Sequence, residues 1–192
     1  TPSGVQGVAP GGTTSFTLAP NTTHVVRDVS GCGGARQGLI YTTGPISADC
    51  TVTATFNAIP QAQAGVLAVL EDSSANPGQL AAIDDGDPLT FSIVTPPARG
   101  GVAFNPSTGA YTYTPSPDAN GNDSFQFLVS DGTSSSTATV SVTITAVNDA
   151  PTVTGAGSIV LPAGSSGAQS VAGFAGFDAG PADEDATQTI AD

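Results

Sequence analysis

Acidic residues are the side chains in this sequence whose types and spacing could do chemistry. The chain carries 16 Asp and Glu, 14 of them Asp, against three Arg, no Lys and one His, and its formal net charge is −13. Asp84, Asp85 and Asp87 follow one apolar stretch, and Asp131 follows another. Carboxylates gathered in one place repel one another unless a cation neutralises them, and Ca²⁺ takes roughly six to eight oxygen ligands. Calcium binding is therefore one interpretation, and solvated Asp-Gly turns are the alternative that the sequence leaves open.

Catalytic residues are not expected in this chain. The single histidine, His24, stands beside apolar residues in NTTHVVRD (21–28) and is interpreted as a structural strand or turn residue. The sequence contains no GxSxG, no HExxH, no phosphate-cradling loop and no pair of Glu residues suited to glycoside hydrolysis. We therefore predict that the protein is not an enzyme.

Charge and hydropathy exclude two classes of partner. Phosphate binding needs a basic surface, and the only basic residues besides the histidine are Arg27, Arg36 and Arg99, so no nucleic-acid partner is expected. No apolar run approaches the roughly 20 residues of a membrane helix, so we expect no membrane insertion in this fragment. Residues 1–10 do not resemble a signal peptide, and any export signal or anchor is expected to lie outside this sequence.

Two cysteines, Cys32 and Cys50, lie 18 positions apart with no CxxC pair and no nearby histidine. This arrangement favours a disulfide over a metal site or a nucleophile. Closing a loop of that size would stabilise the fold by about 3 kcal/mol in the chain-entropy model. The cysteines therefore indicate an oxidising, extracellular or cell-surface location.

Composition and alternation indicate an all-β chain. Gly and Pro together number 39, and Met and Trp are absent, so strand and turn residues dominate over helix formers. Residues 1–59 contain alternating stretches at 13–20 (TTSFTLAP) and 50–59 (CTVTATFNAI), although their sheet pairing is not decided by the sequence. The segment PQAQAG at 60–65 has no periodicity and is predicted to be a linker.

Residues 60–150 are predicted to form a seven-stranded antiparallel β-sandwich. Phe125 and Phe127 alternate with polar residues, and Val140, Val142 and Ile144 do the same, which places each set on one buried face. Tyr111 and Tyr113 alternate likewise. Seven short strands in such a length are typical of a sandwich. The predicted strands are 66–70, 79–83, 89–94, 102–104, 110–114, 124–129 and 138–147.

Strands that run up and down place successive loops at alternate ends of the sandwich. The loops after the second, fourth and sixth strands return to the end where the chain enters, so Asp84, Asp85, Asp87 and Asp131 are expected to converge there. The other loops and the end of the seventh strand lie at the far end of the sandwich. The first acids of residues 151–192 would face that end. The far-end residues are Glu71, Asp72, Asp118, Asp123, Asn148 and Asp149, and those facing them are Asp178, Asp183, Glu184 and Asp185.

The central segment carries five motifs in sequence: LEDSS (70–74), LAAIDDGDPLTFSIVTPPARG (80–100), TGAYTYTP (108–115), NGNDSFQFLVSDG (120–132) and VNDAP (147–151). With these motifs it closely resembles the cadherin-like repeats found in tandem in large bacterial adhesins and matrix proteins. The resemblance covers residues 66–151 almost continuously.

The flanking segments carry weaker resemblances. Residues 151–192 resemble the first half of a further cadherin-like or immunoglobulin-like repeat, which departs from the pattern at 161–164, and residues 1–59 resemble the divergent internalin B-repeat. We therefore expect three modules, at 1–59, 60–150 and 151–192, of which the first and last are incomplete.

The resemblance implies a Greek-key fold and calcium ligands between modules. In cadherins such ligands come from an early Glu, from acids after the second and sixth strands, and from the Asn-Asp linker. Together with the acids placed beside them by the loop geometry, the predicted metal-binding residues are Glu71, Asp72, Asp85, Asp87, Asp131, Asn148, Asp149, Asp178 and Asp183.

The predicted function is that of a structural or adhesive repeat region in a secreted or surface-attached bacterial protein, stiffened by calcium at its module junctions. The expected partners are neighbouring repeats of the same chain or fibre, other copies of the chain, and surface glycans or proteins. Two alternatives stay open. The chain would supply accessory modules of a secreted enzyme, or it would be a filament subunit that exchanges β-strands between copies.

Overall fold

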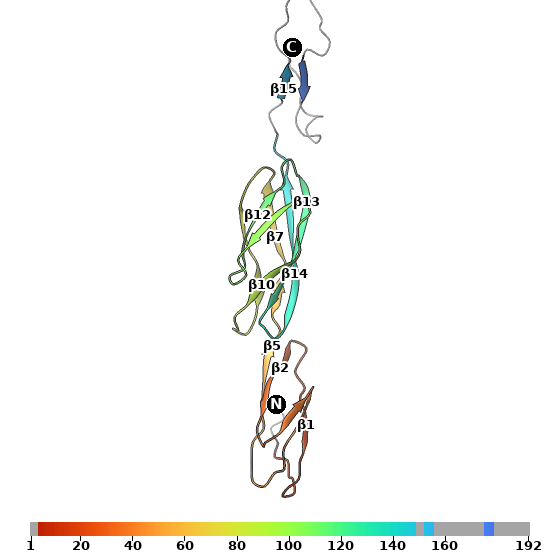
Figure 1. Cartoon of the computed structure of the whole chain (residues 1–192), viewed down its shortest axis with the longest axis vertical. Coiled ribbons are helices and arrows are strands. Elements are labelled where there is room, and N and C mark those ends of the chain that lie inside the picture. Colours follow the sequence, from red (N-terminus) through yellow and green to blue (C-terminus); the bar gives the residue numbers. More distant parts are fainter. Residues whose placement is uncertain (1–3, 149–151, 156–174, 179–192) are drawn as a thin grey trace, which may run out of the picture.

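A computed structural model of the chain describes residues 4–148 and the backbone of two further strands, 152–155 and 175–178. All regular structure in these residues is β-strand, which confirms the predicted all-β class. The strands between residues 15 and 58 form a first unit, and those between 61 and 145 form a second unit above it in Figure 1. Each unit has its own cluster of buried apolar side chains.

The first unit pairs its five strands in two small sheets. The strands are β1 (Ser15–Thr17), β2 (His24–Ser30), β3 (Ala35–Gln37), β4 (Ile40–Thr42) and β5 (Thr53–Ala58). Strand β4 lies between β1 and β3, and β2 pairs with β5 in antiparallel fashion. Leu18, Val26, Val29 and Tyr41 are buried between them. This core is small, so the first unit depends on other constraints.

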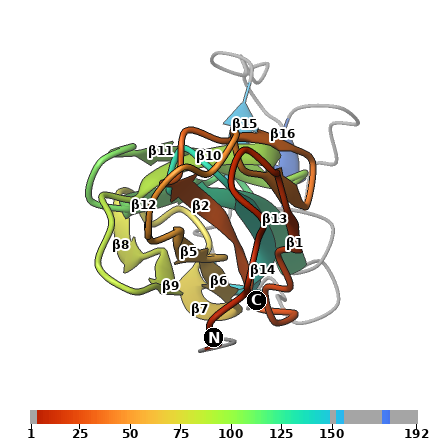
Figure 2. The ribbon, with the colours of Figure 1, turned by 90° about the horizontal axis from the view of Figure 1, so that it is seen from below.

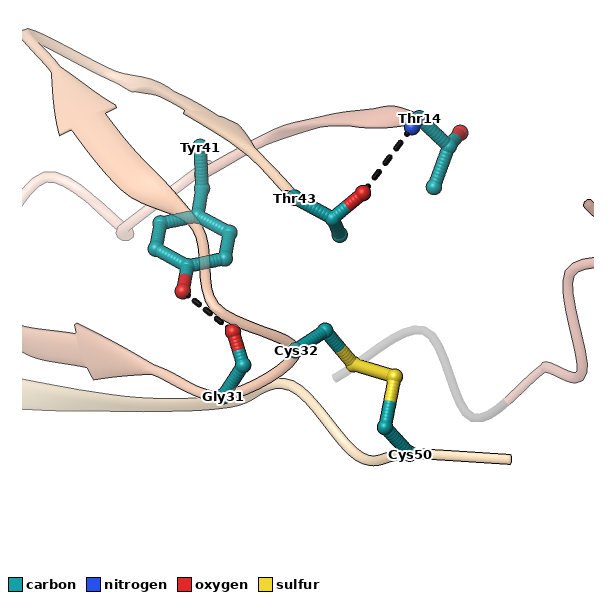
Figure 3. The surroundings of a disulfide bond; sticks show 6 residues. All are labelled: Thr14, Gly31, Cys32, Tyr41, Thr43 and Cys50. Atoms are coloured by element: carbon teal, nitrogen blue, oxygen red, sulfur yellow. Dashed lines mark hydrogen bonds between the residues drawn. A yellow bond between two sulfur atoms is a disulfide. The ribbon is translucent and has the colours of Figure 1, made fainter. Parts of the chain in front are cut away.

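A disulfide supplies one of those constraints, as the sequence predicted (Figure 3). Cys32 and Cys50 are bonded with their Cα atoms 5.5 Å apart. Beside them, the Tyr41 hydroxyl donates to the carbonyl of Gly31. Gly31 has φ +119°, and a Cβ there would lie 1.9 Å from the carbonyl oxygen of Thr51, so only glycine fits. The disulfide therefore ties the end of β2 to the start of β5, where both strands lie farthest from the second unit.

The second unit is built from two facing sheets and a short pair. Strands β10, β13, β14 and β7 form one sheet in that order, strands β11, β12 and β8 form the other, and β6 pairs with β9. The bounds are β6 (Gln61–Gln63), β7 (Gly65–Leu70), β8 (Asn76–Gln79), β9 (Ala81–Ile83), β10 (Thr90–Thr95), β11 (Gly100–Phe104), β12 (Ala110–Pro115), β13 (Gly121–Ser130) and β14 (Ser135–Thr145).

The strand alternation predicted the core of the second unit. Phe125, Phe127, Val140, Val142 and Ile144 are all buried, with at most 2% of each residue exposed. Tyr111 and Tyr113 join them, and the Tyr111 ring meets Phe125 edge-on with 5.3 Å between centroids. Burying these large side chains is the main term that stabilises the unit.

Three details of the second unit differ from the sequence prediction. The predicted linker at 60–65 is not a linker, because 61–63 form β6, which pairs with β9. The predicted strand at 79–83 is two strands in different sheets, separated by the buried Leu80. The sandwich is not antiparallel throughout, since β7 pairs in parallel with β14.

The two units follow one another along the long axis of the molecule (Figure 1). Figure 2 looks along that axis, and the strands of the first unit lie over those of the second. The connection from β5 to β6 consists of Ile59 and the fully buried Pro60. A backbone hydrogen bond of 2.8 Å from Ile59 to Thr23 holds this connection against the first unit. The units are therefore joined by a short, anchored segment.

Two more strands, β15 (Thr152–Gly155) and β16 (Ala175–Asp178), form an antiparallel pair in which Thr152 lies opposite Asp178. Of the predicted third module, these are the residues whose backbone the structure describes. Asp149, Asp183, Glu184 and Asp185 lie outside the described residues.

Candidate cation site at the junction of the two units

Strand ends bring one group of acids to the end of the second unit that faces the first. Ile83, the last residue of β9, pairs with Gln61 at the start of β6, so the next loop begins where the chain enters the unit. That loop carries Asp84, Asp85 and Asp87 and turns at Gly86, whose φ is +112°. Asp131 starts the turn after β13. The expected convergence of these four acids at the entry end is therefore observed.

Three of the acids lie close enough to share a cation. One carboxylate oxygen from each of Asp84, Asp85 and Asp87 lies within 4.8 Å of the others, and this is the one such group of three or more His, Cys, Asp or Glu found in the part of the chain that the structure describes. Burial raises the pKa of the Asp84 carboxyl, and the charges of Asp85, Asp131 and Asp87 raise it further. The nearby backbone N–H of Asp85 offsets part of this effect, although it lies outside hydrogen-bond geometry and leaves both carboxylate oxygens without a hydrogen bond. The loop therefore concentrates negative charge that nothing in the loop itself neutralises.

The first unit approaches these acids with hydrogen-bond donors. Arg27 reaches from β2, and its Nη2 lies 2.9 Å from Oδ1 of Asp87. The backbone N–H of Ala58 donates to Oδ2 of Asp85 over 3.2 Å. Contacts between the two units at this junction are thus polar and pair donors of the first with carboxylates of the second.

Asn57, the next-to-last residue of β5, makes the third of these contacts. Its Nδ2 donates to Oδ2 of Asp131 over 2.7 Å and to the carbonyl of Ala58 over 3.2 Å. Only 1% of Asn57 is exposed. Its neighbour Phe56 packs against the core of the first unit, so Asn57 is on the opposite face of the strand and is covered by the second unit.

Buried oxygens without partners are concentrated at this junction. Among the described residues, the buried side-chain polar atoms that lack a hydrogen bond are Oδ1 of Asn57 and both carboxylate oxygens of Asp84. All three are acceptors, and an unpaired buried acceptor costs about 1–3 kcal/mol. Because Nδ2 and Oδ1 of Asn57 share one carbon and Nδ2 contacts Asp131, the unpartnered Oδ1 is also at the acidic end. These three oxygens therefore lack a hydrogen-bond donor or a cation to bind their lone pairs.

Asp131 differs from the other three acids because protein donors saturate it. Its Oδ1 accepts from the backbone N–H groups of Thr133 and Ser134 at 2.6 and 2.7 Å. The Ser134 hydroxyl donates to Oδ2 at 3.0 Å, next to the contact from Asn57. Although burial acts to raise the pKa of Asp131, these hydrogen bonds hold it below its usual value. Asp131 is therefore an ionised turn residue whose oxygens are already used.

Predicted ligands at the far end of the second unit are also engaged by protein donors. Glu71 is 2% exposed, and its two oxygens accept from the backbone N–H of Val147 and from Nδ2 of Asn120. Oδ1 of Asp72 accepts from the backbone N–H of Asp118 at 3.3 Å. Asn148 also has a partner, and of Asp178 only the backbone in β16 is described. These residues are not brought together as a metal-binding group within the described residues, and their role as ligands stays a prediction.

The single histidine, His24, takes part in a local turn. Nδ1 of His24 lies 2.6 Å from Oδ1 of Asn21 and 3.0 Å from the hydroxyl of Thr23. These contacts agree with its interpretation as a structural residue.

The sequence predicts that Asp84 lies with the converging acids but does not mark it as a ligand, and nothing in the sequence assigns Asn57 or Arg27 to this site. Asn57 gave no signal, because in an alternating strand its position is that of an exposed residue. It becomes buried only when the second unit covers it. The guanidinium of Arg27 contacts Asp87, 60 positions away, and no local pattern predicts this pairing.

Comparison with known proteins places the fold of the second unit. Residues 57–146 match the family model described as the bacterial cadherin-like domain. The second unit has a cadherin-like fold. The match begins at Asn57 itself, so the cadherin-like region includes the residue that bridges the two units. No curated protein matches the sequence.

Several solved structures resemble the chain at modest levels. Human protocadherin-24 EC1-2 has 26% identity and a TM-score of 0.43, and the match covers 50% of this chain and 48% of that one. Protocadherin gamma B7 domains 1–4 have 17% identity and a TM-score of 0.39 over 76% and 49% of the two chains. The endo-fucoidan hydrolase MfFcnA4 from glycoside hydrolase family 107 has 17% identity and a TM-score of 0.39 over 74% and 28%. The chain thus spans less than half of each.

No helix able to span a membrane is found in the described residues. The disulfide between Cys32 and Cys50 fits an oxidising compartment.

Proposed function

We propose that this chain is a non-catalytic spacer segment of an extracellular structural or adhesive protein, in which a calcium ion fixes the junction between the first unit and the cadherin-like second unit. The observation that carries the proposal is the set of three buried, partnerless oxygens on Asp84 and Asn57, beside the carboxylates of Asp85 and Asp87.

Charge at the junction calls for a divalent cation. Asp84, Asp85, Asp87 and Asp131 face a single guanidinium, that of Arg27, so the junction keeps an excess of negative charge. A divalent ion would offset most of it. Desolvated carboxylates without such an ion repel one another strongly, because the effective dielectric constant falls with burial.

The chemistry of the donors favours calcium over other ions. The available ligands are carboxylate and amide oxygens, which hard cations prefer, and in the part of the chain that the structure describes the cluster includes no histidine or cysteine that would select zinc. Ca²⁺ tolerates irregular coordination by about six to eight oxygens, whereas Mg²⁺ demands a near-octahedral arrangement. Asp84, Asp85 and Asp87 would supply carboxylate oxygens, and Oδ1 of Asn57 would link the ion to the first unit.

A mechanical role follows from the arrangement of the units. They lie end to end, joined through the buried Pro60 and through polar contacts that a cation would reinforce. An ion bound by residues of both units resists bending at the junction, so successive units keep a fixed direction. The expected partners are neighbouring repeats of the same chain.

Other roles stay predictions. Flanking sequence and binding assays can test each of them. They are the resemblance of the first unit to internalin B-repeats, attachment of the modules to a secreted enzyme, strand exchange between copies, and contacts with surface glycans or proteins. The module bounds 1–59, 60–150 and 151–192 stay predictions as well.

The test is differential scanning calorimetry of the whole chain in millimolar calcium and in chelator. A ligand at about 100 times its Kd stabilises the native state by about 2.7 kcal/mol, so calcium should raise the midpoint by several degrees. Asp84→Asn and Asp87→Asn should each remove most of that rise. Asp49→Asn is the matched control, since Asp49 is exposed and lies outside the cluster. Coincident curves with and without calcium would overturn the proposal.

A further inference from the structure

A bulge in β2 decides where Arg27 points. The pairing of β2 with β5 shifts register between Val26 and Asp28, so Arg27 is the extra residue. The burial pattern shows the effect, because Val26 and Val29 are buried while Arg27 and Asp28 between them are both exposed. In a regular strand one of any two neighbours would face the core. β-bulges characteristically redirect a side chain in this way.

The redirected guanidinium ends in the acidic cluster. Nη2 of Arg27 lies 2.9 Å from Oδ1 of Asp87, and this is the one salt bridge found among the described residues. Of the two side chains, Asp87 is the more enclosed, with 20% exposed against 54% for Arg27. Asp87 is also one of the three residues whose oxygens lie within 4.8 Å of one another. The same carboxylate is therefore within reach of a tethered monovalent cation and of any ion held by the cluster.

We infer that Arg27 is a built-in competitor for the junction cation, which neutralises Asp87 when the site is empty and lowers the affinity of the site for a divalent ion. The inference rests on the proposed function, because it assumes that the cluster binds a cation. That assumption has support beyond the acids themselves, namely the 1%-exposed Asn57 with its partnerless Oδ1 at the same junction.

Electrostatics fixes the direction of the effect. A bound ion and the guanidinium would carry like charges a few ångströms apart, so each raises the free energy of the other. The ion must either displace Arg27 from Asp87 or bind against its repulsion. Removing the charge should therefore tighten calcium binding by about threefold to tenfold at physiological ionic strength, where the Debye length is about 8 Å. In the absence of calcium the same change should loosen the junction, because Asp87 loses its partner.

The experiment measures calcium affinity of the whole chain by isothermal titration calorimetry for four proteins. These are the wild type, Arg27→Gln, Arg27→Lys and Arg36→Gln. Arg27→Gln removes the charge, and Arg27→Lys keeps it. Arg36→Gln removes an equal charge from an exposed position in β3 of the same unit and corrects for net charge. Circular dichroism and intact Cys32–Cys50 confirm that each variant is folded.

Tighter binding by Arg27→Gln alone, with Arg27→Lys and Arg36→Gln within twofold of the wild type, is the expected result. Equal affinity of Arg27→Gln and wild type would overturn the competition while leaving the calcium site standing. Weaker binding by Arg27→Gln would overturn it too and make Arg27 a supporting residue. No calcium binding by any of the four proteins would overturn both the competition and the proposed function.

Discussion

Nδ2 of Asn57 lies 2.7 Å from Oδ2 of Asp131, although the two residues belong to different units and are 74 positions apart. The same amide leaves its oxygen buried without a partner. The Nδ2 of Asn57 thus makes a hydrogen bond between the units, while its Oδ1 has no hydrogen-bond donor. A residue with both features is a sensitive probe of whether an ion belongs at the junction.

Asn57→Asp should make the stability of the junction conditional on calcium. In chelator it replaces the donor to Asp131 with a further buried carboxylate, which should lower the free energy of unfolding by about 3 kcal/mol. With calcium present, the new carboxylate can bind the ion, and most of the loss should be recovered. Urea unfolding in the two conditions measures the difference.

Asn122→Asp is the control for that substitution, since Asn122 is exposed in β13 and the change in net charge is the same. It should shift stability by less than about 0.5 kcal/mol in either condition. If Asn57→Asp destabilises the protein equally with and without calcium, no ion sits at the junction.

The junction also shows what the sequence could and could not predict. Alternation in the predicted strands 124–129 and 138–147 identifies the buried faces of β13 and β14, because a side-chain period of two depends only on the strand itself. The strand β6 was missed because three residues, with Ala62 facing in between Gln61 and Gln63, carry too short a pattern to detect. The parallel pairing of β7 with β14 depends on a distant partner that the local sequence does not encode.

The residues of the candidate site also fall into a group that the sequence predicts and a group that it does not. Loop positions at strand ends followed from counting strands, and so the convergence of Asp84, Asp85, Asp87 and Asp131 was predictable. The contribution of the first unit was not, because it depends on a bulge at Arg27 and on the burial of an outward-facing Asn57. The bulge lies in the pairing of β2 with β5, which the local pattern does not reveal, and Asn57 is buried only because the second unit covers it.

Loss of the disulfide should unfold the first unit alone. Four side chains form the buried core of that unit, and removing a disulfide that closes such a loop costs about 2–4 kcal/mol. The second unit contains no cysteine and has a much larger core. Hydrogen exchange on the Cys32→Ser/Cys50→Ser protein should show lost protection in β2 and β5 and unchanged protection in β13 and β14. Equal loss in both units would mean that they fold as one.

Asp123 should make the second unit sensitive to acid. Burial acts to raise the pKa of Asp123, but hydrogen bonds from the Ala98, Arg99 and Ser124 N–H groups and the Tyr113 hydroxyl lower it below the usual value. A lowered folded-state pKa contributes stability that is present above the unfolded value near 3.9 and is lost as pH falls through the folded value. Asp123→Asn should therefore destabilise the protein by about 2 kcal/mol at pH 7 and by less at pH 2.

The control for the acid effect is Asp118→Asn. Asp118 has φ +55°, a conformation that Asn tolerates well, and its carboxylate makes no hydrogen bond found among the described residues. Its substitution should change the free energy of unfolding at pH 7 by less than about 0.5 kcal/mol. Tyr113→Phe should reproduce part of the loss in Asp123→Asn, because the hydroxyl donates to Oδ2 over 2.7 Å, and the two changes should not be additive. Additive losses would mean that the two side chains act separately.

A substitution of Glu71 distinguishes a structural role from a metal-binding role at the far end of the second unit. It is almost fully buried, and Oε1 accepts a hydrogen bond from the backbone N–H of Val147, just beyond β14, so it anchors the exit of the chain. If this anchoring is its whole role, Glu71→Gln should lower the free energy of unfolding by about 1–3 kcal/mol, by the same amount in calcium and in chelator. A loss seen only with calcium would instead make Glu71 a ligand, as the resemblance to cadherin repeats implied. Because the neighbouring Asp72 already accepts a hydrogen bond from the backbone N–H of Asp118, we expect Glu71→Gln to lower the free energy of unfolding equally in calcium and in chelator.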